Sequence, residues 1–361
     1  MRSDCRLFED TRLSRVPGVT RAGRLAIFAI GGCLALGLCF VSANLHPRFE
    51  HRAETIHNQL AILAGAPHVI DGVEHQYPQF QSRVLFPLML EGAGRLSVLS
   101  ISQWYLLLRL ATACIALWVF LAVCIGAGMA DVRTASMGAG TLAYALVFTF
   151  NHGWEMPTDF LDVGVYSLAL WLALRRRRLA TAALVAVATL NHQTAAFVSI
   201  VWWSLWAVTD PPRRSFDWSE AVFASALALG SYTESTVVKV WLGSDRSVGY
   251  VVDGWRTVPQ LIEAIRHPQP FAWPVLLAAM WCPVLLWIGA NRAALTGVLR
   301  RLMWAVAAII AVSSPIAFWA ELRSVFLAPI VIASFVAVAA EVRAKEMASD
   351  CRPAGHPAAG A

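Results

Sequence analysis

The feature that most constrains the fold is a succession of apolar segments, each about as long as a membrane-spanning helix, joined by short polar links. The first of them, residues 25–45, is long enough to cross a hydrocarbon layer of about 30 Å. The whole chain is 58% hydrophobic and only 14% charged, which is typical of a polytopic membrane protein. We expect an all-α transmembrane bundle, because a helix satisfies its own backbone hydrogen bonds in lipid.

The basic residues orient the predicted spans. Arginines precede the first span in residues 1–24, four occur in succession at 175–178, and others cluster at 292–301 and 343–345. Because Lys and Arg are retained on the cytoplasmic side, this pattern predicts about ten crossings with both termini inside. The net charge of +6 is explained by these inner loops, so we expect no nucleic-acid partner.

The same reading divides the chain into three parts. Residues 1–24 form a basic cytoplasmic tail, residues 25–342 form the transmembrane domain, and residues 343–361 form a cytoplasmic tail that is rich in Pro, Ala and Gly toward its end and is expected to be disordered. Two long loops, 46–83 and 243–271, are predicted to lie outside.

Two segments near the first outer loop are predicted to be surface helices. Residues 49–63 place Ile56, Leu60 and Leu63 at helical spacing, which favours an amphipathic helix along the membrane surface. Residues 84–99 are apolar but interrupted by the polar stretch EGAGR, so we expect a short helix that dips into the outer leaflet.

A polar, turn-rich passage lies between these two surface segments. Asp71-Gly72 is a turn signal and Pro78 prevents a continuous helix, so Asp71, Glu74 and His75 are predicted on irregular backbone, with Arg83 following them. These residues are candidates for a catalytic or binding site. The alternative is a solvated loop whose arginine extends to the membrane surface.

A second set of acidic residues stands at the start of a later span. Glu155, Asp159 and Asp162 follow the spacing i, i+4, i+7, which places three carboxylates on one helix face, and Pro157 suits the first turn of that helix. Acids in a first turn also favour the helix dipole, which is the alternative for Glu155 and Asp159. It does not account for Asp162, which lies about two turns further along, where an ionisable group requires a partner or a wet cavity.

Two more polar groups interrupt apolar segments at the predicted outer ends of spans. Asn191 and His192 lie at a helix hairpin, where the alternative role is to satisfy freed backbone groups. Glu321 and Arg323 form a tight outer turn and could simply pair with each other. Together with the preceding clusters, these residues predict one outward-facing site, since every histidine except His356 falls on or near the predicted outer face.

Metal and disulfide chemistry are not indicated. The spacings of the histidines match no ligand motif, and the seven cysteines include no CxxC pair. We therefore expect no cofactor and assign no metal ligands, although a divalent ion is compatible with the carboxylates.

Four short stretches resemble signatures of bacterial integral-membrane glycosyltransferases of the GT-C superfamily. They are QSRVLFP at 81–87, EMPTD at 155–159, LNHQT at 190–194 and ELR at 321–323. The plan of a first span, a long outer loop with a surface helix, and many spans with short loops is also similar to that superfamily over residues 25–340. The Asp-x-Asp motif common in its first outer loop is replaced here by Asp71 and Glu74.

The resemblance implies an enzyme that takes a sugar from a polyprenyl-phosphate carrier and transfers it to an acceptor glycan or lipid. Its site would face the periplasmic side of the cytoplasmic membrane, with membrane lipid, the lipid-linked donor and the acceptor as partners. Asp71 or Glu74 would be the base, and the substrate-binding residues would be Arg83, His75, Glu155, Asp159, Asp162, Asn191, His192, Glu321 and Arg323. Among these, Arg83 and Arg323 would bind the phosphate.

Three other functions remain open from the sequence. The outer loop 243–271 contains Arg246, Arg256, Arg266 and His267, which an O-antigen polymerase or ligase-like enzyme would use. A flippase or transporter of lipid-linked glycans would show broken, polar helices near the middle of the membrane and related halves. A non-catalytic assembly subunit would tolerate substitution of Asp71 or Arg83.

Overall fold

The computed structural model describes residues 21–45, 52–66, 68–70, 73–75, 83–96, 98–127, 130–149, 157–207, 216–242, 272–314 and 322–350. The described chain is predominantly α-helical, as predicted, with one short β-hairpin as the exception. Its helices are α2 (Arg21–Leu45), α3 (Arg52–Leu63), α4 (Leu85–Gly94), α5 (Ile101–Gly126), α6 (Val132–Thr149), α7 (Pro157–Leu174), α8 (Arg178–Thr189), α9 (Phe197–Trp202), α10 (Trp218–Trp241), α12 (Ala272–Ala290), α13 (Gly297–Ser313) and α14 (Leu322–Asp350).

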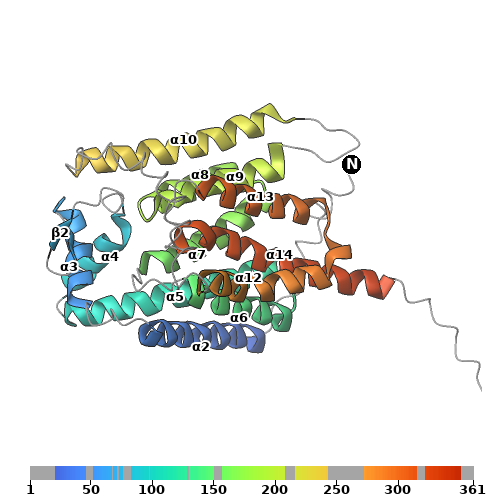
Figure 1. Ribbon diagram of the computed structural model, residues 1–361, viewed down its shortest axis with the longest axis horizontal. Helices are drawn as coiled ribbons and strands as arrows, with labels where there is room; N and C mark the ends of the chain where they lie inside the picture. The colour runs from blue at the N-terminus through green and yellow to red at the C-terminus, as the bar shows by residue number, and fades with distance from the viewer. Residues whose placement is uncertain are drawn as a thin grey trace, which may run out of the picture.

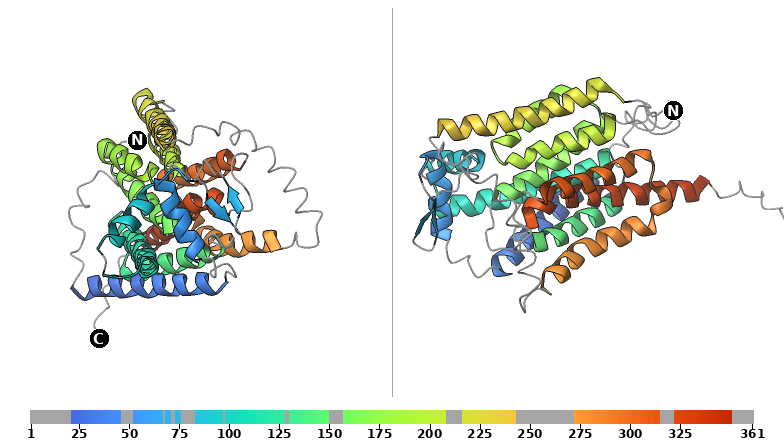
Figure 2. Two further views of the ribbon diagram at one scale, coloured as in Figure 1. Left: turned by 90° about the vertical axis from the view of Figure 1, so that its left-hand side faces the viewer. Right: turned by 45° about the horizontal axis from the view of Figure 1, so that its top comes forward.

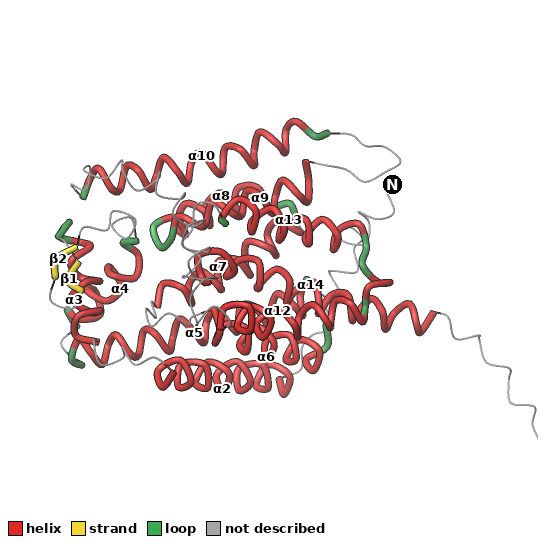
Figure 3. The backbone as a smooth tube through the Cα atoms, viewed as in Figure 1, coloured by secondary structure: helices red, strands yellow, loops and turns green. Residues whose placement is uncertain are grey.

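The long helices lie side by side along the longest axis of the molecule (Figure 1). α2 and α10 are on opposite sides of this bundle, while α3, α4 and the hairpin cover one end of it (Figures 1 and 2). In Figure 3 the helices account for most of the described chain, and the two strands appear only at that covered end. We call this end, with α3 and α4, the capped end.

Three of the described helices are long and apolar enough to cross a membrane. The qualifying segments are 23–41 of α2, Ile101–Gly126, and 325–349 of α14. The 26 residues of α5 extend for about 39 Å at 1.5 Å per residue, which exceeds the thickness of a hydrocarbon core. The chain therefore has the helices of a membrane protein.

The core is built around α14. Residues 325–338 are all buried, and the helix contacts α6, α7, α12 and α13. A helix that is apolar all round is stable only when protein or lipid covers every face, and here protein covers it. α6 comes close because Gly138 has no side chain, and a Cβ at that position would collide with Val338.

The helix starts follow the sequence signals. α7 begins at Pro157, which confirms the predicted first-turn role of that proline. Ser100 and Gln103 form a reciprocal capping box at the start of α5, and Asp131 accepts a hydrogen bond from the Thr134 backbone N–H at the start of α6. Asp217 caps α10 in the same way through Ser219 and Glu220.

The elements at the capped end match the predicted short surface helices. α3 covers most of the amphipathic segment, and α4 is only ten residues long. They pack together and against α5 through Ile56, Phe86, Leu90 and Tyr105. Between α3 and α4, strands β1 (His68–Ile70) and β2 (Val73–His75) form an antiparallel hairpin, with His68 opposite His75, that the sequence reading did not predict.

Two helices depart from the predicted plan. The apolar segment after the LNHQT stretch is not one regular α-helix: a 3-10 turn, η3 (Gln193–Ala196), is followed by α9 and a π-helical turn, η4 (Trp203–Ala207). α14 contains Pro329 and continues to Asp350, through residues that were expected to begin a disordered tail. Local helix geometry, including 3-10 and π turns, depends on tertiary contacts that a hydropathy pattern does not carry.

Candidate functional site

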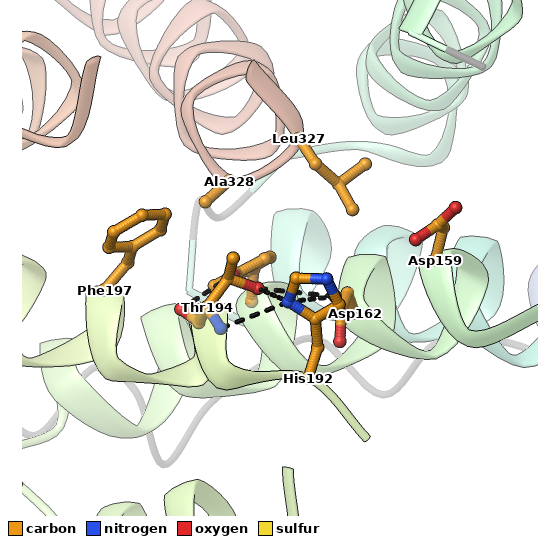
Figure 4. A pocket seen from close by; sticks show the side chains of 8 residues that line it. Asp159, Asp162, His192, Thr194, Phe197, Leu327 and Ala328 are labelled. Carbon is orange, nitrogen blue, oxygen red and sulfur yellow. Dashed lines mark hydrogen bonds and ion pairs between the residues drawn. The ribbon is translucent and has the colours of Figure 1, made fainter. Parts of the chain in front are cut away.

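A polar cavity opens where α7, the turn after α8, and α14 meet. Its lining combines three ionisable side chains and a tyrosine with apolar side chains of α9 and α14 (Figure 4). The lining residues are Asp159, Asp162, Tyr166, His192, Thr194, Phe197, Leu327 and Ala328. Asp159 and Asp162 are both nearly fully buried, so their charges are removed from bulk solvent.

Asn191 joins the break after α8 to the acidic face of α7. Its side chain is completely buried, and its Nδ2 donates to Asp162 Oδ1 at 2.7 Å and to the Thr158 carbonyl oxygen at 2.8 Å. The Thr158 carbonyl belongs to α7, so this contact does not satisfy a group freed at the helix break; that alternative role falls to His192, whose Nδ1 accepts from the Thr194 backbone N–H. The contact of Asn191 with Asp162 fixes the orientation of the Asp162 carboxylate.

His192 is held so that one ring nitrogen accepts and the other carries the proton. The Thr194 backbone N–H donates to His192 Nδ1 at 3.1 Å, and Thr194 Oγ1 lies 2.6 Å from the same nitrogen. With Nδ1 as acceptor, the neutral ring carries its hydrogen on Nε2, a tautomer inferred from these contacts. His192 Nδ1 is also 3.9 Å from Asp162 Oδ2, so a protonated ring would pair with that carboxylate.

Tyr166 supports the same turn from one helical turn below Asp162. Its hydroxyl donates to the Thr194 carbonyl oxygen at 2.8 Å, while Thr194 Oγ1 donates to Asp162 Oδ2 at 3.5 Å. The turn at residues 191–194 is thus tied to α7 at several points. The acid, the imidazole and the hydroxyl are positioned as one network.

Arg83 brings a positive charge to this network. Its side chain is only 7% exposed, and it acts electrostatically on Asp162 and on Lys239 of α10. The alternative of a surface-extending arginine does not hold, because the guanidinium is inside the protein. The backbone next to it is fixed by a hydrogen bond of 3.0 Å from the Leu85 N–H to the Leu190 carbonyl oxygen.

An apolar cluster at the capped end holds Arg83 and Lys239 in place. It joins α3, the start of α4, the end of α8 and the end of α10 through Ile62, Leu63, Val84, Leu190, Val238 and Leu242. Gly65, at φ +62°, turns the chain after α3 and lets it approach the Leu242 carbonyl closely, where a Cβ would collide. Arg83 immediately precedes Val84 of this cluster, and Lys239 immediately follows Val238.

The structure brings together five of the predicted site residues: Arg83, Asp159, Asp162, Asn191 and His192. Glu74 and His75 lie in β2, and Arg323 lies in the first turn of α14, but the structure does not describe their side chains. Asp71, Glu155 and Glu321 lie outside the described residues. The roles given to these six residues stay predictions.

Sequence reasoning missed Tyr166 and Thr194. Tyr166 follows Asp162 by four residues, so helical spacing alone places it on the same face of α7. Thr194 follows His192 by two residues, a spacing at which short polar side chains often bond to nearby backbone in turns. Both spacings can be seen in the sequence, but such spacings are common. They gain meaning only because α7 and the 191–194 turn are in contact in the structure.

Another buried carboxylate lies at the other end of the bundle, which we call the arginine end. Glu220 is fully buried at the start of α10 and accepts hydrogen bonds from Arg176 Nε at 2.5 Å, Trp202 Nε1 at 2.9 Å and Arg178 Nε at 3.1 Å. Burial raises the pKa of the Glu220 carboxyl, but the hydrogen bonds from Arg178, Trp202 and Arg176 outweigh it and the pKa is lowered.

Comparison with known protein families, with curated proteins and with solved structures found no match to this chain. Within the described ranges, no group of three or more His, Cys, Asp and Glu side chains is arranged to hold a metal ion.

Proposed function

We propose that the protein is an integral-membrane glycosyltransferase that moves a sugar from a polyprenyl-phosphate carrier to an acceptor glycan or lipid. In this proposal about ten segments cross the cytoplasmic membrane, both termini are inside, and the cavity faces the periplasmic side. The observation that carries the proposal is one cavity lined by two buried carboxylates and a histidine, with a buried arginine, Arg83, close enough to act electrostatically on Asp162.

Glycosyl transfer from a lipid phosphate needs two kinds of group. The bond between the sugar C1 and the phosphate oxygen breaks, a new bond forms between C1 and the acceptor oxygen, and the acceptor hydroxyl loses its proton. A carboxylate must take that proton, a contribution of about 10²–10⁴-fold. A cation or hydrogen-bond donor must stabilise the departing phosphate, for which arginine is well suited.

We assign the proton acceptor to Asp159. Both carboxylates line the cavity (Figure 4). Because Asp162 accepts hydrogen bonds from Asn191 and Thr194 of the 191–194 turn, we give Asp162 a structural role and Asp159 the role of base. Asp162 then serves as a positioning residue, because its contacts with Asn191 and Thr194 hold the turn that carries His192. Asp71 and Glu74 remain the alternative bases on the resemblance to the GT-C superfamily.

The departing phosphate would be bound by Arg83 and by the Nε2–H of His192. Arg83 offsets the repulsion between Asp159 and Asp162, which lie one turn apart on α7. An anion that enters the cavity next to Arg83 would replace part of that interaction. The cavity would then hold an acid–base pair and a phosphate side by side.

The direct test measures polyprenyl-phosphate release by the full-length protein in proteoliposomes, with a panel of polyprenyl-phosphate hexoses and a membrane glycan fraction as acceptor. Asp159→Asn should lower the rate about 100-fold or more, since it removes the base. Glu91→Gln is the matched control, because Glu91 is also an acid at the capped end but pairs at the surface with Arg95.

Two outcomes would overturn the proposal. One is the absence of release by the wild-type protein with every donor in the panel. The other is full activity of Asp159→Asn and of Asp71→Asn and Glu74→Gln, each folded and inserted. Loss in Asp71→Asn alone would keep the reaction and move the base to the first outer loop.

A transporter of lipid-linked glycans is the second candidate, because one helical segment is broken. α8 stops at Thr189, and the chain then passes through η3 and α9 to the π-helical turn η4. Broken helices that line a polar site are characteristic of secondary transporters. Movement of a fluorescent lipid-linked glycan between leaflets, without release of polyprenyl phosphate, would favour this function.

A further inference from the structure

Four consecutive arginines follow α7, and they divide into two kinds. Arg176 and Arg178 both form ion pairs with Glu220, and Arg176 also forms one with Asp217 at 3.4 Å. Arg175 and Arg177 are exposed, and within the described residues neither meets a carboxylate. Arg175 instead lies over the Trp171 ring, with its guanidinium carbon 4.5 Å from the ring centroid.

Exposed apolar side chains lie beside these arginines. Leu179, the next residue along the chain, is 87% exposed, and Trp218 at the start of α10 is 73% exposed. The two helix starts are joined by a hydrogen bond of 2.8 Å from Arg178 to the Ser219 hydroxyl. A polar turn with an exposed leucine and an exposed tryptophan is not a typical water-exposed surface.

Two further rings extend the apolar part of this surface. The Phe216 ring lies 4.6 Å from Trp218 and 5.6 Å from Trp203, in edge contacts, and both Phe216 and Trp203 are exposed. Aromatic rings with a polar edge are enriched at the boundary between lipid and water. Arginines beside them would meet the phosphates of the headgroups.

We propose that this basic aromatic surface, formed by Arg175, Arg177, Leu179, Phe216 and Trp218, binds the headgroups of anionic phospholipids. The two arginines supply the charge, and the rings and Leu179 enter the upper acyl region beside them. Arg176 and Arg178 join the turn before α8 to the start of α10 through their ion pairs with Glu220, and so fix the two parts of this surface relative to each other. The inference does not depend on the proposed glycosyl transfer, because it concerns the opposite end of the bundle.

An anionic lipid is favoured over a protein partner by two observations. The surface lies at the end of a bundle that contains helices long enough to cross a bilayer. Its charges are of one sign, since the acids in the turn, Asp217 and Glu220, are engaged by Arg176 and Arg178. A surface of this kind is attracted to a negatively charged leaflet, and each basic residue near the surface contributes measurably.

The experiment titrates the detergent-solubilised full-length protein with phosphatidylglycerol and, separately, with phosphatidylcholine, and follows the thermal unfolding midpoint. Wild type should be stabilised by phosphatidylglycerol at lower concentrations than by phosphatidylcholine. Arg175→Gln/Arg177→Gln should raise the phosphatidylglycerol concentration needed for half of the effect by about tenfold or more, because two phosphate contacts are lost.

Two matched controls separate a local site from general attraction. Arg133→Gln/Arg300→Gln removes the same charge from exposed positions on α6 and α13, and it should leave the midpoint of the titration unchanged. Trp218→Ala should weaken binding several-fold, whereas Trp304→Ala, which removes an equally exposed tryptophan (73%) from α13, should not.

Equal responses to both lipids in the wild type, or equal losses in the two double variants, would overturn the proposal. If the Arg175/Arg177 variant does not fold, the charge-conserving Arg175→Lys/Arg177→Lys variant takes its place. It should retain the preference for phosphatidylglycerol, since a point charge suffices near a lipid surface. Loss of the preference in that folded variant would also contradict the inference.

Discussion

Two of the buried carboxylates in the described part of the chain, Glu220 and Asp162, differ in what surrounds them. Glu220 accepts from two arginines and an indole, so its charge is compensated and its oxygens are occupied. Asp162 accepts from an amide and, weakly, from a hydroxyl, with a second carboxylate one turn away and a cavity beside it. The comparison teaches that burial alone does not mark a reactive site. A buried carboxylate that has few hydrogen-bond donors and lies next to a cavity is the better candidate for a reactive group.

The largest expected effect breaks the compensated cluster. Glu220→Ala leaves Arg176 and Arg178 without their common partner and Trp202 without an acceptor in a buried position. We expect the free energy of unfolding to fall by about 3 kcal/mol, the low end for breaking a buried pair, since both arginines are partly exposed. Chemical unfolding in a mild detergent measures the change.

Asp162→Asn is the counterpart at the capped end, and it should change stability much less than Glu220→Ala. The asparagine keeps its volume and relieves repulsion from Asp159, while a hydrogen bond from Asn191 can still be accepted. Glycosyl transfer should nevertheless fall, because the turn that carries His192 loses the carboxylate that Thr194 contacts. A stability loss in Asp162→Asn as large as that of Glu220→Ala would remove the distinction between the clusters.

The next effect sharpens the assignment of Arg83, and it rests on the proposed function. Arg83→Lys keeps the positive charge near Asp162 but loses the planar fork that binds a phosphate in two places. Affinity for a lipid-linked sugar donor should fall by about tenfold or more, the equivalent of about 1.4 kcal/mol. Arg95→Lys, at an exposed position paired with Glu91, should leave donor affinity unchanged.

Unchanged donor binding in the Arg83→Lys variant would show that Arg83 serves only to balance the acids. Arg323 would then be the better phosphate ligand. Circular dichroism and gel filtration should show the same fold and the same size for both lysine variants.

A smaller loss of stability is expected from removing an ordinary helix cap at the arginine end, and it serves as a reference for the Glu220 cluster. The Asp131 carboxylate accepts from the Thr134 backbone N–H at 2.6 Å, and this bond is the main reason that the pKa of Asp131 is lowered. Asp131→Ala should cost about 1 kcal/mol of unfolding free energy. A loss equal to that of Glu220→Ala would mean that the Glu220 cluster contributes no more than a cap.

The smallest expected effect is on the pH dependence of the stability. The pKa of Glu220 is lower in the folded protein than in the unfolded chain, so its contribution to stability is present above the unfolded value of about 4.3. It is lost as the pH falls through the folded value. Wild type should therefore lose stability more steeply below pH 4 than Glu220→Gln, measured as unfolding midpoints from pH 3 to pH 7. Parallel curves would contradict the charge-based account.

Part of this arrangement could be predicted from the sequence. The apolar runs predicted helices, Pro157 marked the start of α7, and LNHQT marked a break, which the structure places after Thr189. α4 is short, as predicted, but it continues through the polar stretch after Leu90 to Gly94. These features depend on neighbouring residues, and local pattern is enough to find them.

The pairings within the site could not be predicted in the same way. Asp162 and Asn191 are 29 residues apart, and whether they meet depends on the rotation of α7 and on where α8 ends. The roles of Tyr166 and Thr194 depend on the same contact. The β-hairpin has only three residues in each strand, too few for alternation to be distinguished from chance. About ten crossings remain a proposal, since three described helices meet the length and hydropathy of a span.

The hydrogen bond between Leu85 and Leu190 has a consequence for the order in which the protein assembles. The carbonyl that α8 leaves unused at its end fixes the start of α4, which was synthesised about a hundred residues earlier. Because chains are made from the N-terminus, Arg83 leaves the ribosome long before its partners on α7 and the 191–194 turn exist. The cavity is therefore completed late in biogenesis, and in a chain stopped before residue 190 the Leu85 N–H at the start of α4 would lack its acceptor.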